Sequence, residues 1–234
     1  MIGEAMLRPS YRRVSHARLL LVVSAAALAA CSGPREVTAG SGEVRVSEGE
    51  VGFPAIVSAG SFSGSSSEMS GYHLIVWDEG RAAGEALFRT PVSDLAVLEA
   101  LESLGAVPGD ALTTESWNRR KDPEDPEPGR VIEGPPVDIL VRVPGRSEPL
   151  VPADYLIDPG GRGVRMRFGG HRANREEWHS GCVACLFSCP GSKVGNAAYT
   201  IRDFVDGTTR FEVRSGVLPP DGTRVEIVLR LTDP

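Results

Sequence analysis

The stretch TRVEIVLRL, Thr223 to Leu231, alternates between apolar and polar side chains. One face of an extended chain would carry the apolar residues Val225, Ile227, Leu229 and Leu231. Glu226 and Arg230 would lie on the opposite face. Because successive side chains of a β-strand point to opposite faces, this period of two predicts a strand with one buried side. A Pro-Pro-Asp-Gly turn precedes the strand at residues 219–222.

Other stretches upstream have a similar extended character. We expect strands at residues 72–77 (YHLIVW), 137–143 (VDILVRV), 164–168 and 209–214. They are rich in β-branched or alternating apolar residues, and Gly or Pro lies close to their ends.

The sequence offers a single convincing helix, at residues 94–104. Apolar side chains recur there at helical spacing, with Ser93 or Asp94 as the N-cap. Gly105 would end the helix, and Pro108 follows it. The helix therefore has one apolar face to bury against the strands.

The segments between these elements are long and irregular. Residues 58–71 are rich in Ser and Gly, and residues 119–136 are rich in Pro and charged residues, a composition that disfavours helix and central strand. We therefore predict an α+β fold in a single domain over residues 51–234. It would consist mostly of short β-strands, with one main amphipathic helix and long Gly/Pro-rich loops.

The N-terminus has the pattern of an export signal. Four arginines precede the short apolar run LLLVVSAAALAAC, which ends at Cys31. A basic segment, an apolar core and small residues before a cleavage point describe a secretory signal. Residues 28–31 resemble a bacterial lipobox, which implies a lipoprotein signal peptide at residues 1–30. The same resemblance implies that Cys31 is lipidated with diacylglycerol.

Charge and composition limit the classes of partner that the protein can bind. The chain has a net charge of −6, which argues against the basic surface that nucleic-acid binding needs. Removing residues 1–30 takes away four Arg and one Glu and leaves a net charge of −9. Attraction to anionic lipid is therefore weak, and the acyl chains would have to anchor the protein. Residues 32–50 are small, polar and Gly-rich, and we expect Cys31 with this segment to form a flexible tether at residues 31–50.

Two longer stretches resemble a known family. GYHLIVWDEGRAAGEALFRTPVSDLAVLEALESLGAVPGDALT, residues 71–113, resembles the front half of YdjY-type secreted proteins. GCVACLFSCPGSKVGNAAYTIRDFV, residues 181–205, resembles the cysteine-containing back half of some members. The resemblance covers about residues 51–215. It implies a ferredoxin-like cysteine cluster, and it implies no activity, because the family is essentially uncharacterised.

Three of the four cysteines lie in the loop WHSGCVACLFSCPGSKVGN, residues 178–196. Their spacing, Cys182-x2-Cys185-x3-Cys189-Pro, is the second half of the bacterial ferredoxin run. Three residues before Cys182, His179 stands where ferredoxins have their first thiolate. The pattern predicts a metal site formed by His179, Cys182, Cys185 and Cys189, with His171 or His73 as other candidates for the imidazole.

The cofactor of such a site is open between an iron–sulfur cluster and zinc, because a Cys3His set suits both. Two further interpretations remain. Two of the three cysteines can form a structural disulfide after export, which leaves a spare thiol. Alternatively, Cys182 and Cys185 can act as a redox dithiol. His73 lies in an apolar stretch, which favours a core or surface histidine over a ligand.

These features together indicate a lipid-anchored, extracytoplasmic protein of the bacterial cell envelope. Its metal site would serve electron transfer or sensing, with a redox or envelope protein as partner. The alternative is a non-enzymatic binding or assembly module in which two cysteines form a disulfide. No Gly-x-Ser-x-Gly motif or paired carboxylates indicate hydrolysis, and the sequence leaves open whether the protein is an enzyme.

The lipobox resemblance is directly testable. The wild-type protein is expected to partition into detergent with the membranes. Cys31→Ser is expected to stay unprocessed and to carry no acyl chains, because the thiol that receives the lipid is missing. Metabolic labelling with a radioactive fatty acid measures this, and normal labelling of the variant would contradict the lipoprotein interpretation.

Overall fold

The computed structural model describes residues 35–39, 42–64, 66–110, 112–170, 172 and 178–232. Its strands are β1 (Arg35–Ala39), β2 (Gly42–Ser47), β3 (Glu50–Val57), β4 (His73–Trp77), β5 (Phe88–Thr90), β6 (Val137–Arg142), β7 (Leu156–Ile157), β8 (Met166–Phe168), β9 (Cys182–Cys185), β10 (Val194–Asn196), β11 (Glu212–Val213) and β12 (Arg224–Leu231). Its helices are α1 (Ala59–Gly64), α2 (Asp94–Ser103), α3 (Thr114–Asn118), α4 (Pro152–Tyr155) and α6 (Ile201–Val205), with 3₁₀ turns η1 (Ala83–Glu85) and η2 (Glu127–Gly129).

The alternating C-terminal stretch forms β12, a strand at the centre of the sheet. Val225, Ile227 and Leu229 are buried, whereas Arg224 and Arg230 are exposed. β12 pairs antiparallel with β3 on one side and with β6 on the other. Because both edges of β12 are hydrogen-bonded, the register of its two neighbours is set by this strand.

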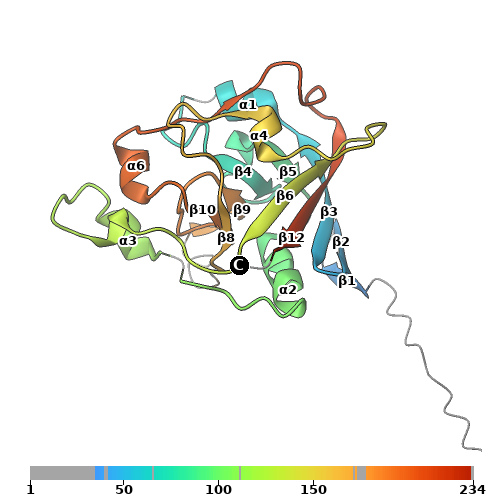
Figure 1. Cartoon of the computed structure of the whole chain (residues 1–234), viewed down its shortest axis with the longest axis horizontal. Helices are drawn as coiled ribbons and strands as arrows, with labels where there is room; N and C mark the ends of the chain where they lie inside the picture. Colours follow the sequence, from blue (N-terminus) through green and yellow to red (C-terminus); the bar gives the residue numbers. More distant parts are fainter. Residues whose placement is uncertain are drawn as a thin grey trace, which may run out of the picture. The chain divides into compact units, whose positions relative to one another are not determined.

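The sheet continues from β3 around most of a barrel-like circuit (Figure 1). One edge of β3 pairs with β12, and its other edge pairs first with β2 and then with β5. The order from there is β5, β4, β9, β10 and β8. β8 and β6 lie at the two ends of this circuit, and the only strand pairing between them among the described residues is an isolated bridge between Pro136 and Arg167. The sheet is therefore nearly closed.

This architecture corrects the α+β expectation: the protein is mostly β, built on one ten-stranded sheet. The helix expected at residues 94–104 is present as α2, but the other α-helices among the described residues have only four to six residues. The sequence did not show the extent of the sheet, because β5 and β10 have three residues each. A strand that short is too brief to show a periodic pattern.

The expected tether also differs from the structure. Residues 42–47 form β2, and its alternate residues Val44 and Val46 are buried in the core. The compact unit spans Gly33–Pro234, so the globular part begins before residue 51. Cys31 and residues 1–30, which we expect to form the signal peptide, lie outside the described residues.

Helix α2 begins where its cap predicts. The Ser93 hydroxyl accepts a hydrogen bond from the Ala96 N–H at 3.1 Å, which satisfies one free amide of the first turn. The helix packs against β2, β3 and β9, and its first residue, Asp94, is buried. In the described part of the chain, no helix has the length and apolar character needed to cross a membrane.

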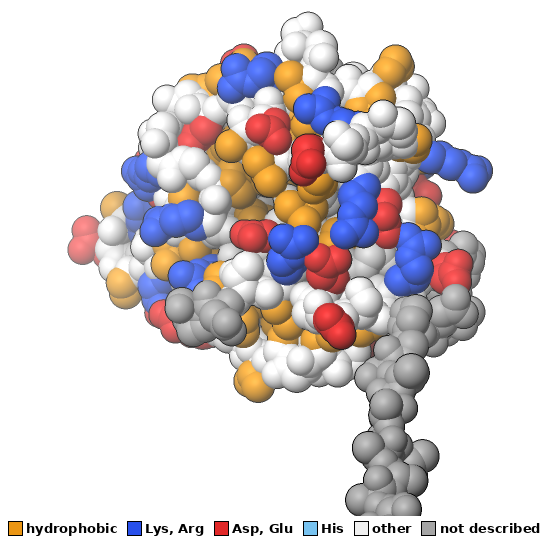
Figure 2. Space-filling view, turned by 45° about the vertical axis from the view of Figure 1, so that its right-hand side comes forward, with side chains coloured by type: hydrophobic (Ala, Val, Ile, Leu, Met, Phe, Trp, Pro, Cys, Tyr) orange, Lys and Arg blue, Asp and Glu red, His pale blue; other side chains and the backbone are white. Residues whose placement is uncertain are grey.

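Charged side chains of both signs are interspersed on the face shown in Figure 2. On the solvent face of β12, Glu226 pairs with Arg45 and with Arg142, the latter at 3.4 Å. Arg230 pairs with Glu50 at 2.7 Å. Such exposed pairs add little stability each, but opposite charges on neighbouring strands favour this register over a slipped one.

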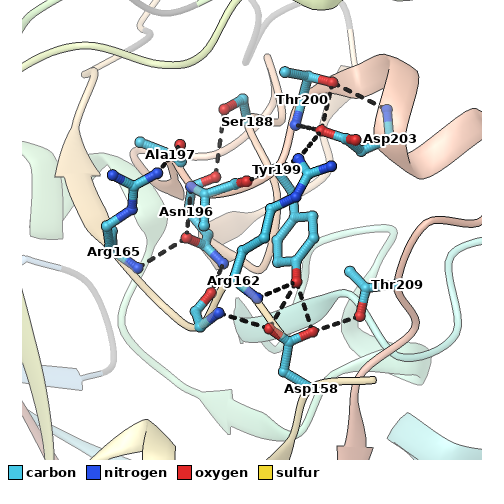
Figure 3. A network of polar contacts seen from close by, with 12 residues as sticks. Asp158, Arg162, Arg165, Ser188, Asn196, Ala197, Tyr199, Thr200, Asp203 and Thr209 are labelled. Carbon is cyan, nitrogen blue, oxygen red and sulfur yellow. Dashed lines mark hydrogen bonds and ion pairs between the residues drawn. The ribbon is translucent and has the colours of Figure 1, made fainter. Parts of the chain in front are cut away.

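A polar network ties the loop after β7 to the segment after β10 (Figure 3). The Asp158 carboxylate accepts hydrogen bonds from the Tyr199 hydroxyl at 2.7 Å, from the Thr209 hydroxyl at 2.6 Å and from the N–H groups of Gly160 and Gly163. Burial raises the pKa of Asp158, but these hydrogen bonds outweigh it, so its pKa lies below the ordinary carboxylate value. The ionised form of Asp158 therefore stabilises the fold.

Asn196, at the end of β10, belongs to the same network and is fully buried. Its amide nitrogen donates to the carbonyls of Gly163 and Leu186, and its amide oxygen accepts from the N–H groups of Arg165 and Ala198. Because both donors and both acceptor positions are used, Asn196 fixes β10 against its surroundings.

Replacing Asp158 is expected to reduce stability in a pH-dependent way. Asp158→Asn should lower the free energy of unfolding at pH 7 by about 2 kcal/mol, because a charged acceptor of several hydrogen bonds is lost. The folded pKa is depressed, so the wild-type advantage is present above the unfolded pKa and disappears as the pH falls through the folded pKa. Urea unfolding at pH 7 and pH 3 measures both. Asp138→Asn, at an exposed carboxylate, is the control and should change stability by less than about 0.5 kcal/mol.

Candidate metal centre

Two register shifts in the pairing of β4 with β9 create the site. Cys182 pairs with Val76, and Ala184 pairs with Ile75. Between these two pairs β9 therefore contains one more residue than β4. The next pair is Cys185 with His73, and between it and the Ala184–Ile75 pair β4 contains one more residue than β9. In a regular strand, residues three apart point to opposite faces. The extra residue in β9 reverses that alternation and allows Cys182 and Cys185 to share one face.

The same geometry brings His73 to both sulfurs. Its Nδ1 lies 3.7 Å from Cys182 Sγ and 3.4 Å from Cys185 Sγ. The two sulfurs lie 2.7 Å apart, and no disulfide joins the three described cysteines. One atom from each of these three side chains lies within 4.8 Å of the others, which is a suitable arrangement for a metal ion.

Cys189 reaches the group from the loop between β9 and β10. A hydrogen bond with Cys185 lowers the pKa of Cys189 first of all, and the N–H groups of Gly191 and Ser192 and the charge of Lys193 add to this effect. Burial raises the pKa of Cys182, and burial together with the neighbouring thiols raises that of Cys185 further. Cys189 is therefore the thiol whose ionised form is best stabilised.

His73 is held in the form that binds metals. The side chain is almost completely buried, and this desolvation lowers its pKa to about 4. At neutral pH the imidazole is therefore uncharged, with a lone pair available on one ring nitrogen. A neutral imidazole and ionisable thiols are the ligand types that zinc and iron take from proteins.

A buried ion pair lies beside the thiols. Lys193 Nζ is 2.9 Å from Asp94 Oδ2, and both side chains are 1% exposed. The charge of Lys193 acts on Cys182 and Cys189, and that of Asp94 acts on Cys182. Desolvating two charges is costly. Next to its sulfurs the site therefore holds both the cation of Lys193 and the Asp94 carboxylate that pairs with it, and the two have opposite effects on the pKa of Cys182.

The expected ligands are brought together only in part. Cys182 and Cys185 lie together with His73, and Cys189 is hydrogen-bonded to Cys185, but His179 does not join them. Its side chain is exposed, its backbone has a positive φ of 48°, and its carbonyl accepts a hydrogen bond from the Arg81 N–H. His73, the alternative candidate, lies at the site instead. His171 lies outside the described residues.

Sequence reasoning missed Lys193 and Asp94 as components of the site. Lys193 lies in GSKVGN, a stretch of small and apolar residues in which a lysine is unusual. Asp94 was recognised only as a potential helix cap. Their partnership depends on α2 packing against β9, a contact that no local pattern predicts.

A close contact between glycines holds the start of β9 in place. A Cβ on Gly80 would lie 2.4 Å from the Ser180 carbonyl oxygen and 2.6 Å from Gly181 Cα. Gly181 itself has a φ of 68°, a conformation that favours glycine. Hydrogen bonds from Arg81 and Ala82 to this segment complete the contact. Cys182 follows directly, so the position of its thiol depends on the absence of a side chain at Gly80.

Gly80→Ala is therefore expected to destabilise the protein by about 2 kcal/mol or more, because the new methyl group meets backbone atoms that cannot move aside. Gly84→Ala is the matched control. A Cβ there has no neighbour within 4 Å, so stability should be nearly unchanged. Thermal and urea unfolding measure the difference, and equal stability of the two variants would show that the contact is not as tight as described.

Comparison with known proteins agrees with the sequence resemblance. The model of the YdjY domain family matches residues 43–230. The chain is 30% identical to the uncharacterized protein YdjY of Escherichia coli (strain K12) over 162 residues, which is 69% of this chain and 68% of that protein. No solved structure matches the chain significantly. The chain therefore belongs to the YdjY domain family.

Proposed function

We propose that this protein binds one zinc or iron ion through His73, Cys182 and Cys185, with Cys189 as the fourth ligand. The observation that carries the proposal is the convergence of three buried ligand atoms within 4.8 Å of one another. Ionised thiols buried among apolar side chains would need a partner of opposite charge. Binding a cation gives the thiolates that partner.

The separations favour a single ion over an iron–sulfur cluster. Ligands at about 2.0–2.3 Å from one ion can lie no more than roughly 4.6 Å apart. The distances from His73 Nδ1 to the two sulfurs, 3.4 and 3.7 Å, are within this limit. Ligands of a cluster bind different iron atoms and are spread more widely. Two thiolates in a tetrahedral site are roughly 3.8 Å apart, so binding would widen the Cys182–Cys185 pair.

The metal's identity decides the role. Iron in a thiolate-rich site supports electron transfer or redox sensing, whereas zinc is redox-inactive and would make the site structural. The complete burial of the ligands favours these roles over catalysis at the metal, because a catalytic metal keeps a position open to substrate.

The cellular setting is part of the same proposal. The signal-like residues 1–30 and the lipobox ending at Cys31 support export and lipid anchoring at the bacterial cell envelope. The partners would be the membrane, through the acyl chains on Cys31, and a redox or envelope protein.

A second candidate function is a redox dithiol. The sulfurs of Cys182 and Cys185 are near enough, at 2.7 Å, that oxidation would join them with little movement. The oxidising environment outside the cytoplasm favours this reaction. In this case the pair would switch between dithiol and disulfide, and Cys189 would remain a free thiol.

Metal analysis of the anaerobically purified protein tests the proposal. The wild type should contain about one zinc or iron ion per chain. His73→Ala should lose this ion, because one of its four proposed ligands is missing. His179→Ala is the matched control: this exposed histidine lies outside the group, so the variant should retain the metal. A metal-free wild type with one intact disulfide in mass spectrometry would favour the dithiol instead. Equal metal loss in both variants would refute the role of His73.

A further inference from the structure

The gap between β6 and β8 contains a cavity of about 590 Å³. At one end the two strands meet at the bridge between Pro136 and Arg167. At the other end Val141 of β6 pairs with Leu150, after which the chain turns away into α4. The cavity lies within the range of volumes typical of small-molecule sites, and it is separate from the metal centre.

The inner lining of this β6–β8 cavity is apolar. Its buried walls are formed by Ile139, Leu156, Met166 and Phe211. Ile139 comes from β6 and Met166 from β8, so the two unpaired edges of the sheet provide opposite walls. Such a lining suits the hydrocarbon part of a ligand.

Backbone groups with no partner face the same gap. In β6 the peptide groups alternate in direction, and those of Val141 exchange hydrogen bonds with Leu150 at 2.8 and 2.9 Å. The peptide N–H and C=O of Ile139, two residues earlier, point to the same side of β6 as those of Val141. They have no hydrogen-bond partner there among the described residues. Ile139 is only 2% exposed. Buried peptide groups are normally paired, so these groups are available for a ligand.

Val164 presents the matching feature on the opposite wall. The carbonyl of its neighbour Arg165 accepts a hydrogen bond from the Ala197 N–H at 2.8 Å, so Arg165 faces β10. Alternation then turns the peptide groups of Val164 toward β6. Within the described part of the chain they have no hydrogen-bond partner. The cavity thus has peptide donors and acceptors on both sides.

The β8 wall is basic. Arg165 and Arg167 line the cavity, and each donates to a backbone carbonyl, but neither has a carboxylate partner among the described residues. The carboxylate of Asp158 also lines the cavity, but it is engaged by four donors of its own network. Asp138 of β6 also lines the cavity and is exposed; its side chain leaves β6 on the face opposite to Ile139, just as those of Arg165 and Arg167 leave β8 on the face opposite to Met166.

We propose that the β6–β8 cavity binds an amphipathic carboxylate, such as a medium-chain fatty acid. The hydrocarbon chain lies against Ile139, Met166 and Phe211. The acid group binds the guanidinium groups of the β8 wall and the open N–H of Val164. An apolar ligand without an acid group would leave those donors unpaired, and a cation would be repelled by the two arginines. This proposal does not depend on the metal centre.

A fluorescence titration of the full-length protein with 11-(dansylamino)undecanoic acid tests the site. Saturable binding is expected, with displacement by dodecanoic acid at concentrations at least about tenfold lower than by dodecylamine. Ala153→Trp places an indole at the exposed rim of the cavity and should weaken binding at least about tenfold. Ala153→Ser is the matched control and should bind like the wild type.

Arg165→Gln combined with Arg167→Gln examines the acid group separately. In this variant the displacement of the probe by dodecanoic acid should be weaker, whereas its displacement by dodecanol should be unchanged. Simple misfolding would not produce such a difference. Absence of saturable binding to the wild type overturns the proposal. Equal binding by wild type and Ala153→Trp, or equal displacement by the acid and the amine, overturns it as well.

Discussion

The double register shift between β4 and β9 is the constraint on which the centre of this protein depends. Regular pairing would direct Cys182 and Cys185 to opposite faces of β9, and no rotamer change could bring their sulfurs together. One extra residue in each strand changes the alternation of side chains, so that the two cysteines and His73 point toward the same place. Both strands are paired on their far edges as well, β4 with β5 and β9 with β10, so the shifted register cannot slip without breaking the neighbouring pairs.

The electrostatic environment fits this geometry. Three thiols and an imidazole are buried in the hydrophobic core, where low polarity favours their neutral forms. Cys189 is the exception, because a hydrogen bond with Cys185, two backbone N–H groups and the charge of Lys193 lower its pKa and favour its thiolate. A purely structural group of buried cysteines needs no such stabilisation. The proposed ligation of a cation would use it, because metal binding requires the thiols to lose their protons.

The sequence indicated the periodic parts of this molecule and missed the parts set by distant contacts. The alternation at residues 225–231 and the capped pattern after Ser93 are local signals, and β12 and α2 lie where they predict. β9 shows no alternation because all four of its residues are buried. Most of the short strands that make the sheet nearly closed carried no signal of their own, which is why the fold class was wrong.

The ligand set shows the same division. Cysteine spacing along the chain suggested a group of three thiols, and the structure places Cys182 and Cys185 together, with Cys189 hydrogen-bonded to Cys185. Extending that linear motif to His179 failed, since the imidazole at the site comes from a strand more than 100 residues earlier. Only the β4–β9 pairing places His73 there, and that pairing is not visible in either segment alone.

Strand β10 lies between the proposed metal centre and the β6–β8 cavity. Lys193 immediately precedes this three-residue strand and contributes charge to the thiols. The strand pairs with β9 on one side and, on the other, with β8, which forms a wall of the β6–β8 cavity. A change in β10 would therefore disturb both sites and could not distinguish them. His73 and Ala153 both lie outside β10, in β4 and α4, so substitutions there separate metal binding from binding in the cavity.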